Sequence, residues 1–348
     1  MTNSVSTPDE RLEHLEKPGL EIRENFEISK GDFLILCAGF EERALAVLKN
    51  TPLPNGFNVV LIHYKPFINE NKAPEIESTC KGRGINLLEL NYNREDPIGF
   101  GRELVEIISE CKGRIFIDIS AMSRLLIVQT LVALKKNRLN EFSDCFLTYA
   151  EARVYPPSEA EAAKELAKVE LDSSSDIYFL SSGVFGVTII PELSSYSFSG
   201  VQTRLIAFPS LDSHQLTALR VELQPSRFSF IEGIPPAPHN QWRKKAIADI
   251  NHLTRMKDAE FYPVSTLDYR ETLSCLQKLY VKYGIQERLL IAPIGSKMQA
   301  VGVGIFRAFV EDIQIVYPTP QEFQSPGKYT QGIGKMYQLP LEGFSNQK

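Results

Sequence analysis

Short apolar runs alternate with segments of helical periodicity along most of the chain, beginning at Gly31. A short, continuously apolar run bounded by turn residues is typical of a strand that is buried on both faces of a parallel sheet. The segments between the runs repeat apolar residues every three or four positions, which predicts amphipathic helices. Strands that alternate with helices in this way predict an α/β fold with mainly parallel sheets.

The first half of this pattern predicts five strands joined by helices. The expected strands span residues 33–39, 58–64, 85–92, 114–120 and 145–152. The expected helices span residues 41–50, 100–111 and 125–137. Each strand except the last is thus followed by a turn or helix that returns the chain to the same edge of the sheet.

The second half repeats this order. Its expected strands span residues 203–210, 227–233, 259–265, 288–296 and 313–320, and its expected helices span residues 214–223, 242–256, 268–284 and 298–310. The repeat predicts two tandem Rossmann-like domains related by internal duplication. We place a mobile or docking N-terminal arm at residues 1–30, the first domain at 31–175, a connector with extra strands at 176–200 and the second domain at 201–348.

The composition is that of a globular protein large enough for two cores. The chain has 348 residues, of which 43% are hydrophobic and 23% are charged. Its net charge of −5 provides no general attraction for nucleic acid or anionic lipid, so binding to genomic DNA or membranes is not expected. The N-terminus lacks the pattern of a signal peptide, and no apolar stretch is long enough to span a bilayer, which predicts a cytoplasmic location.

Cysteine and histidine lack the spacing of a metal site. The five cysteines are scattered and odd in number, which favours a reducing compartment and buried thiols. The five histidines form no HExxH or HxH pair. We therefore expect neither a bound metal ion nor a cofactor.

Candidate chemistry follows the strand of residues 114–120. Ligands of open parallel sheets bind beyond the carboxyl ends of the strands. Asp118 lies on an otherwise apolar strand, where a carboxylate needs a partner. Ser120, Ser123 and Arg124 follow it and offer hydroxyls, N–H groups and a guanidinium to a phosphate or ribose. The structural alternative is that a serine caps the next helix while Asp118 anchors the loop.

The equivalent strand exit of the second half carries Gly295, Ser296 and Lys297. A glycine turn that enters a helix suits the close approach of a phosphate, and the lysine supplies positive charge. The spacing is not that of a P-loop. The structural alternative is a glycine turn with Ser296 as the helix cap and Lys297 in solvent.

Two further groups of strand exits complete the candidate site. Gly39, Glu41, Glu42 and Arg43 follow the first strand, although two acidic residues in a first helical turn also suit the helix dipole and repel phosphate. The exits of the fifth strands of the two halves, with the late segment YTQGIGKMY, supply residues that can stack on a base and hold its sugar, or simply pack a loop. They are Tyr149, Glu151, Arg153, Tyr155, Tyr317, Tyr329, Gly332, Gly334 and Lys335.

These motifs carry a family resemblance. GSKM at 295–298 resembles a shortened form of the glycine-threonine-lysine signature of CARF domains, the CRISPR-associated Rossmann-fold sensors, and DISAMSR at 118–124 occupies the equivalent place in the first half. Two such halves in one chain are similar to the SAVED domains of bacterial anti-phage systems. The resemblance covers residues 31–175 and 200–340, and it implies a cyclic or linear oligonucleotide signal as ligand. By the same resemblance the pocket would contain Ser120, Ser123, Arg124, Gly295, Ser296 and Lys297.

Three hypotheses follow. In the first, the chain is a sensor of prokaryotic antiviral defence that binds a nucleotide second messenger between its halves, with an effector protein or a second copy as further partners. In the second, it is a metal-independent enzyme that cleaves a cyclic oligonucleotide or an N-glycosidic bond, with Lys297 and Arg124 stabilising charge and Asp118 or Glu151 as acid or base. In the third, it is a partner-binding scaffold with degenerate pockets.

Overall fold

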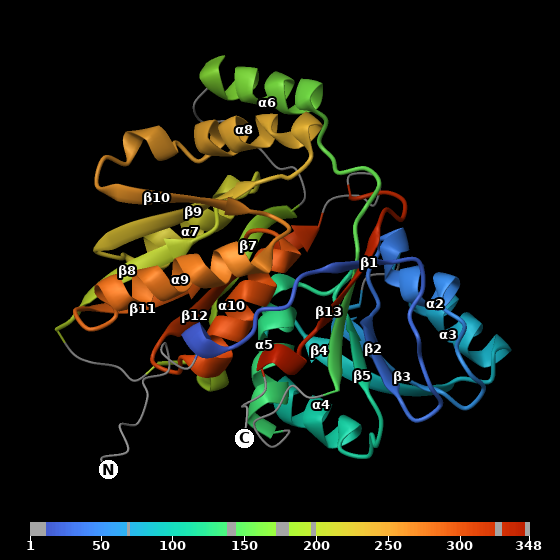
Figure 1. The fold of residues 1–348 in the computed structure, drawn as a ribbon. Coiled ribbons are helices and arrows are strands. Elements are labelled where there is room, and N and C mark those ends of the chain that lie inside the picture. Colours follow the sequence, from blue (N-terminus) through green and yellow to red (C-terminus); the bar gives the residue numbers. More distant parts are fainter. Residues whose placement is uncertain are drawn as a thin grey trace, which may run out of the picture.

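The computed structural model describes residues 12–67, 70–137, 144–171, 181–195, 200–323 and 329–344. These residues form two β-sheets, one of seven strands and one of six, together with the helices that connect them. Figure 1 shows the two sheets side by side, with α5 (Arg124–Asn137) and α10 (Lys297–Phe309) between them. The predicted α/β fold class is confirmed.

The first sheet has the strand order β1-β13-β6-β5-β2-β3-β4. Five of its strands are mutually parallel. They are β2 (Phe33–Cys37), β3 (Asn58–Lys65), β4 (Asn86–Asn93), β5 (Ile115–Asp118) and β6 (Cys145–Ala150). All five coincide with predicted strands, because runs such as β2, which is buried along its whole length, bury both of their faces only inside a sheet.

The second sheet repeats this topology with the order β10-β9-β8-β11-β12-β7. Its parallel strands are β8 (Gln202–Ala207), β9 (Arg227–Ile234), β10 (Ala259–Ser265), β11 (Glu287–Ala292) and β12 (Gln314–Phe323). Counted along the chain, the parallel strands of each sheet are ordered 3-2-1-4-5, which is Rossmann-like. The predicted repeat is therefore present in the order of the strands.

Each sheet also contains one antiparallel strand that the chain forms after leaving the other sheet; β7 lies within the predicted connector of residues 176–200, and β13 lies in the second half. After β6 and α6 (Glu159–Leu171), the chain forms β7 (Ser181–Ile189), which pairs with β12 of the second sheet. After β12, it forms β13 (Met336–Pro340), which pairs with β6 of the first sheet. The sequence analysis placed residues 336–340 with the second domain, whereas the structure inserts them into the first sheet. The two halves are thus interlocked by an exchange of strands.

The described part of the N-terminal arm is docked on both halves, since Tyr269 Oη of the second half also donates to the carbonyl oxygen of Pro18 at 2.8 Å. β1 (Glu21–Arg23) pairs with β13, and the side chains of Leu12 and Phe26 are buried. Residues 1–11 lie outside the described part of the chain. Of the two alternatives for the arm, mobile or docking, the structure supports docking for residues 12–30.

Most predicted helices are present, with one correction. The expected helix over residues 41–50 consists of a 3₁₀ turn (Glu42–Leu45) followed by the short α2 (Ala46–Asn50). Two helices, α3 (Ala73–Gly82) and α6, were not predicted. The others are α4 (Phe100–Ile108), α7 (Ser213–Leu223), α8 (Trp242–Ile250) and α9 (Tyr269–Tyr283). None of the described helices is long and apolar enough to cross a membrane.

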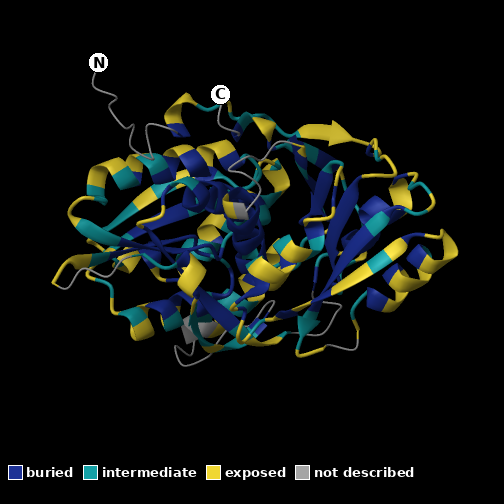
Figure 2. Ribbon diagram, turned by 90° about the horizontal axis from the view of Figure 1, so that it is seen from below, coloured by how far each residue is buried: buried dark blue, intermediate teal, exposed yellow. Residues whose placement is uncertain are grey.

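One continuous apolar core joins the two halves. It includes residues of β2 and β5 from the first half and of β8 and β11 from the second, and Figure 2 shows these central strands buried. α10 is buried along most of its length and packs directly against α5. The contact is close because Gly304 has no side chain, and a Cβ there would lie 2.7 Å from Leu131 Cδ1 and 3.3 Å from Val128 Cα. All five cysteines are buried, as predicted, and none of them forms a disulfide.

Substitution Gly304→Val is expected to destabilise the protein by about 1–3 kcal/mol, because the added methyl groups overpack the α5–α10 contact. The midpoint of urea-induced unfolding measures the change. Gly82→Ala is the matched control, since a Cβ at that helical position meets no atom within 4 Å. This control is expected to leave stability unchanged or slightly raised. Equal midpoints for Gly304→Val and the unmodified protein would contradict the close packing.

Candidate functional site

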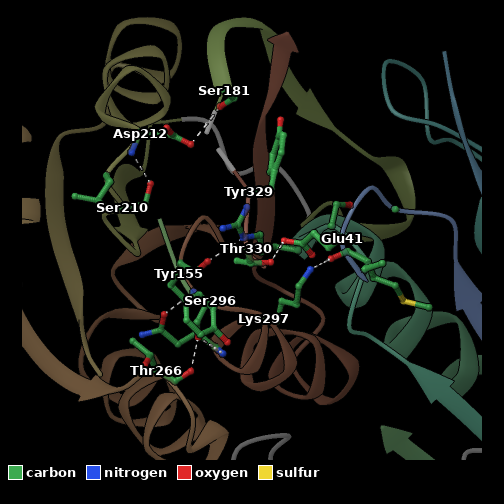
Figure 3. A pocket seen from close by; sticks show the side chains of 18 of the residues that line it. Glu41, Tyr155, Ser181, Ser210, Asp212, Thr266, Ser296, Lys297, Tyr329 and Thr330 are labelled. Atoms are coloured by element: carbon green, nitrogen blue, oxygen red, sulfur yellow. Dashed lines mark hydrogen bonds between the residues drawn. The ribbon is translucent and has the colours of Figure 1, made fainter. Parts of the chain in front are cut away.

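A cavity of about 430 Å³ lies where the carboxyl ends of the parallel strands of the two halves face one another. This volume is in the usual range for sites that bind small molecules. Residues that follow β2 and β5 line it from the first half, and residues that follow β8 and β11 line it from the second. Figure 3 shows side chains from both halves converging on it, among them Glu41 and Lys297.

The two strand-exit motifs predicted from the sequence form hydrogen bonds with each other at the wall of this cavity. Arg124, at the start of α5, donates from Nε to the carbonyl oxygen of Gly295 at 2.9 Å. Lys297, at the start of α10, donates from Nζ to the carbonyl oxygen of Met122. Each half therefore sends its basic side chain to the backbone of the other half's turn, and all four residues line the cavity.

The two serines of these motifs cap helices. Ser123 Oγ accepts the N–H of Leu126 at 3.2 Å. Ser296 forms a capping box with Gln299, and its hydroxyl also donates to the carbonyl oxygen of Thr266 at 2.6 Å. The structural alternative is thus correct for both serines. Both also line the cavity, so the N-termini of α5 and α10 begin at its wall and add positive potential there.

Gly295 is required by close packing at this turn. A Cβ there would lie 2.3 Å from Gln299 Oε1 and 2.9 Å from Phe208 Cβ. Gly39 plays the same part in the first half, where a Cβ would lie 2.8 Å from the Cβ of Ala121. Both glycines line the cavity, so the backbone itself forms part of its wall.

Lys297 is the most perturbed cation of the site. Its pKa is lowered to about 7, chiefly by burial and then by the positive charge of Arg43, while Glu41 opposes the shift. The structural alternative placed Lys297 in solvent. This is wrong, because the side chain is partly buried and donates to the backbone of Met122. A lysine that gains or loses its proton near neutral pH, and that faces a cavity, is a candidate for binding an anion or for transferring a proton.

Arg43 is held in a buried ion pair. Its Nε lies 2.8 Å from Glu41 Oε2 and its Nη2 lies 3.0 Å from Glu41 Oε1. Glu41 also accepts the hydroxyl of Thr330, from the C-terminal part of the chain. Burial alone would raise the pKa of Glu41, but Arg43 and Lys297 outweigh burial and lower it. Glu41 and Arg43 both line the cavity, so this ion pair places one negative and one positive charge at its wall.

Arg94 is a cavity-lining cation with unsatisfied hydrogen-bond donors. It directly follows β4, and its Nε and Nη1 atoms are buried with no hydrogen-bond acceptor among the described residues. Its guanidinium carbon lies 4.7 Å from the ring centre of Phe323, and burial lowers its pKa. A buried guanidinium with unsatisfied donors is costly unless an anion or acceptor completes it. Since Arg94 lines the cavity, such an acceptor would come from a ligand.

Aromatic side chains form the wall beside Arg94. The rings of Phe40 and Tyr329 are 5.0 Å apart at their centres, and Phe323 lies 5.7 Å from Phe40. Tyr149 and Tyr317 line another part of the same cavity, as the sequence analysis expected of them. Planar apolar surfaces of this kind can stack on a nucleobase.

Three of the residues predicted at the exits of β2 and β5 do not line the cavity. Asp118 and Ser120 are buried behind its wall, where Asp118 Oδ1 accepts the N–H of Ser120 at 3.0 Å and Ser120 Oγ accepts the N–H of Ala150 at 2.8 Å. Burial raises the pKa of Asp118 to about 6, against the effect of its bonds to Ser120. Asp118 therefore anchors β5 to β6. Glu42 is exposed, whereas its neighbour Glu41 lines the cavity.

A second polar group lies across the cavity from Lys297, as Figure 3 shows for Ser181 and Asp212. Ser181 Oγ, on β7, donates to Asp212 Oδ2 at 3.2 Å and lies 3.3 Å from His214 Nε2. Asp212 precedes α7 and lines the cavity together with Ser181.

The sequence analysis missed Arg94 and Asp212. Both follow parallel strands, β4 and β8, so the strand-exit rule applied to every strand would have found them. Tyr329 was among the candidates predicted around the fifth strands, and it lines the cavity. Phe323 had no comparable signal, since its position beside Phe40 depends on tertiary packing.

Comparison with protein-family models gave no match, and neither did comparison with curated proteins. Among solved structures, the cytoplasmic domain of a prokaryotic cation chloride cotransporter matches at 10% identity and a TM-score of 0.25, over 86% of this chain and 97% of that one. A ketoreductase domain of the bacillaene assembly line matches at 15% identity and a TM-score of 0.20, over 80% of this chain and 63% of that one.

An N-terminal ketoreductase of the macrolactin assembly line matches at 12% identity and a TM-score of 0.21, over 90% of this chain and 77% of that one. TM-scores this low carry no argument about function. The Rossmann-like description rests on the strand order of the two sheets.

Proposed function

We propose that the cavity between the two halves binds a nucleotide or oligonucleotide second messenger. The observation that carries the proposal is Arg94 at the wall of the cavity, whose buried Nε and Nη1 atoms have no hydrogen-bond partner in the part of the chain that the structure describes. A phosphate oxygen is the acceptor that best suits a guanidinium. Arg94 therefore favours a ligand with a phosphate group.

Two further features support a nucleotide over a simple anion. Five basic and three acidic residues line the cavity, which makes it positive in a chain of net charge −5. The aromatic wall of Phe40, Phe323 and Tyr329 provides a surface for a base beside the cations. Phosphate and base would thus each find a suitable part of one cavity.

The CARF and SAVED resemblance extends the proposal to a sensor of prokaryotic antiviral defence. The bonds of Arg124 and Lys297 across the cavity join the two halves, so a bound ligand that competes for these cations would change how the halves contact each other. Binding would then shift the population of arrangements that an effector partner recognises.

A thermal-shift panel of cyclic di-, tri- and tetranucleotides, linear oligoadenylates, NAD and ATP tests the proposal, because a ligand of the native state raises the melting temperature. We expect at least one nucleotide to raise it, and Lys297→Ala to reduce the rise. Lys49→Ala, at an exposed position of α2, is the control that should behave like the unmodified protein. Absence of a shift with every nucleotide would contradict the proposal and favour the partner-binding scaffold.

The affinity for a cyclic dinucleotide is expected to fall as the pH rises from 7 to 9. The pKa of Lys297 is about 7, so its positive charge is present below this pH and is lost above it. The loss approaches a factor of about ten per pH unit if only the charged form binds. Glu41, whose pKa is lowered, stays ionised throughout this range, and the phosphodiesters of the ligand do not titrate in it.

Isothermal titration calorimetry at several pH values measures this dependence, and Lys297→Met is expected to abolish it. The same slope in both proteins would assign the pH dependence to another group.

A hydrolytic function is the second candidate, favoured by the contact between Ser181 Oγ and His214 Nε2 at 3.3 Å. A hydroxyl next to an imidazole is the arrangement of an activated nucleophile. In this alternative Ser181 would attack a phosphodiester or ester, and Ser181→Ala would retain binding but lose turnover. Chromatography of nucleotides after long incubation with concentrated protein is the test, and an unchanged substrate would exclude this function for the compounds used.

A further inference from the structure

His63, on β3, is a buried side chain with unsatisfied nitrogen atoms. The residue is 6% exposed, and neither Nδ1 nor Nε2 has a hydrogen-bond partner among the described residues. Both atoms are also closed to solvent. A neutral imidazole has one donor and one acceptor, and leaving both unpaired in the interior costs free energy. The acceptor nitrogen is also a strong ligand for transition metals.

Two carboxylates face this imidazole from neighbouring elements. Glu89 lies on β4, where it pairs with Leu61 of β3, and the alternation of side chains places it on the same face as His63. Glu77 approaches from α3, which covers this face. One ligand atom from each of the three residues lies within 4.8 Å of the other two, and His63 Nε2 is 4.0 Å from Glu89 Oε2.

We propose that His63, Glu77 and Glu89 bind a divalent transition-metal ion such as Zn²⁺. One imidazole and two carboxylates form a donor set that zinc uses, and three protein ligands leave a fourth position for water or a ligand. Bond lengths near 2.1 Å in a tetrahedral site require donor atoms about 3.4 Å apart. The present distances between the donor atoms are only slightly longer than this, and both glutamates are exposed and can move toward the buried histidine.

The surroundings of His63 suit such a site. The ring of Phe67 stands edge-on to the imidazole at 6.1 Å between centres, and the ammonium of Lys65 lies over the Phe67 ring at 3.0 Å. The apolar ring shields one side of the histidine from solvent, which strengthens electrostatic binding of a cation. The ammonium of Lys65, which would repel a metal ion, is instead in a cation–π contact with Phe67.

The sequence analysis expected no metal ion because the histidines lack a recognisable spacing. In this site each ligand comes from a different element, and only the packing of α3 against β3 and β4 brings them together. The site is on the face of the first sheet that carries α3 and is independent of the nucleotide proposal. The next residue along β3, Tyr64, lines the nucleotide cavity.

Calorimetric titration of the chelator-treated full chain with ZnCl₂ tests the proposal. We expect one equivalent of zinc to bind, and the affinity to fall at least roughly tenfold in His63→Leu and in Glu89→Gln, since loss of even an outer-shell partner has an effect of this size. Glu75→Gln is the matched control, because Glu75 is an exposed acid on the same helix that pairs with Lys72 outside the cluster. MgCl₂ is expected to bind far more weakly, as it disfavours imidazole.

Melting temperatures separate binding from folding. Zinc should raise the melting temperature of the unmodified protein and of Glu75→Gln, but not of His63→Leu. Without metal, His63→Leu should melt at the same temperature as the unmodified protein or higher, because it removes two unpaired buried atoms. If that variant does not fold, Glu89→Gln decides the result. Absence of zinc binding, or equal affinity in the ligand variants and the control, would overturn the proposal.

Discussion

A chain that ends after Lys335 is expected to lose the cooperative folding of the first half. It lacks β13 and the segment that follows, whose buried apolar side chains belong to Met336, Tyr337, Leu339, Leu341 and Phe344. At about 1.5–3 kcal/mol for each buried side chain, the loss is on the order of 10 kcal/mol. This is comparable with the whole stability of an ordinary domain, and the loss also leaves β1 and β6 without their partner.

Thermal unfolding followed by circular dichroism and limited proteolysis measure this effect. A chain that ends after Phe344 is the control and is expected to unfold as the full chain does. A peptide of residues 336–344 added in trans should restore part of the cooperative transition, because it supplies the missing strand. An unchanged transition in the chain that ends after Lys335 would show that the exchanged strand is dispensable.

Arg94→Met is expected to weaken nucleotide binding about thirtyfold or more while leaving the protein folded. Loss of one partner of a buried, charge-assisted contact costs about 2–5 kcal/mol of binding free energy. Stability without ligand should stay the same or increase, because the substitution keeps the apolar stem and removes a guanidinium with unsatisfied donors. Weaker binding together with unchanged or higher stability would indicate that the guanidinium serves ligand binding and not the fold.

Calorimetry with the nucleotide that gives the largest thermal shift measures the affinity, and urea unfolding measures the stability. Arg102→Met, at an exposed position of α4, is the matched control for loss of one positive charge. If Arg94→Met and Arg102→Met bind equally well, the guanidinium of Arg94 does not contact the ligand. Strong destabilisation of Arg94→Met would instead indicate that Arg94 serves the fold.

The exchanged strands give the proposed site a rigid frame. The connector strand β7 pairs with the second sheet and β13 of the second half pairs with the first sheet, and the close contact of α10 with α5 at Gly304 also holds the two halves together. A cavity between two such halves stays formed without ligand, which lowers the cost of ordering on binding.

The apolar pattern determined most of the local structure. The parallel strands of both sheets and the helices α4, α5, α7, α9 and α10 appear where the periodicity predicted them, because burial of one or both faces dictates that periodicity. The strand-exit rule placed Arg124, Gly295 and Lys297 at the cavity for the same reason: the carboxyl ends of parallel strands share one edge of a sheet.

Only the tertiary structure decided which strands pair, which polar side chains meet, and which of them face the cavity. The pattern of residues 336–340 shows that the strand is buried but does not encode its partner, so the exchange with β7 was not predictable. Asp118 turned inward to Ser120, and of the two neighbouring acids only Glu41 lines the cavity while Glu42 is exposed, since the direction of a side chain at a turn depends on local backbone angles. Two donor atoms of Arg94 have no hydrogen-bond partner among the described residues, and His63 lies near two glutamates. Both features depend on how elements far apart in the chain pack together, which local periodicity cannot specify.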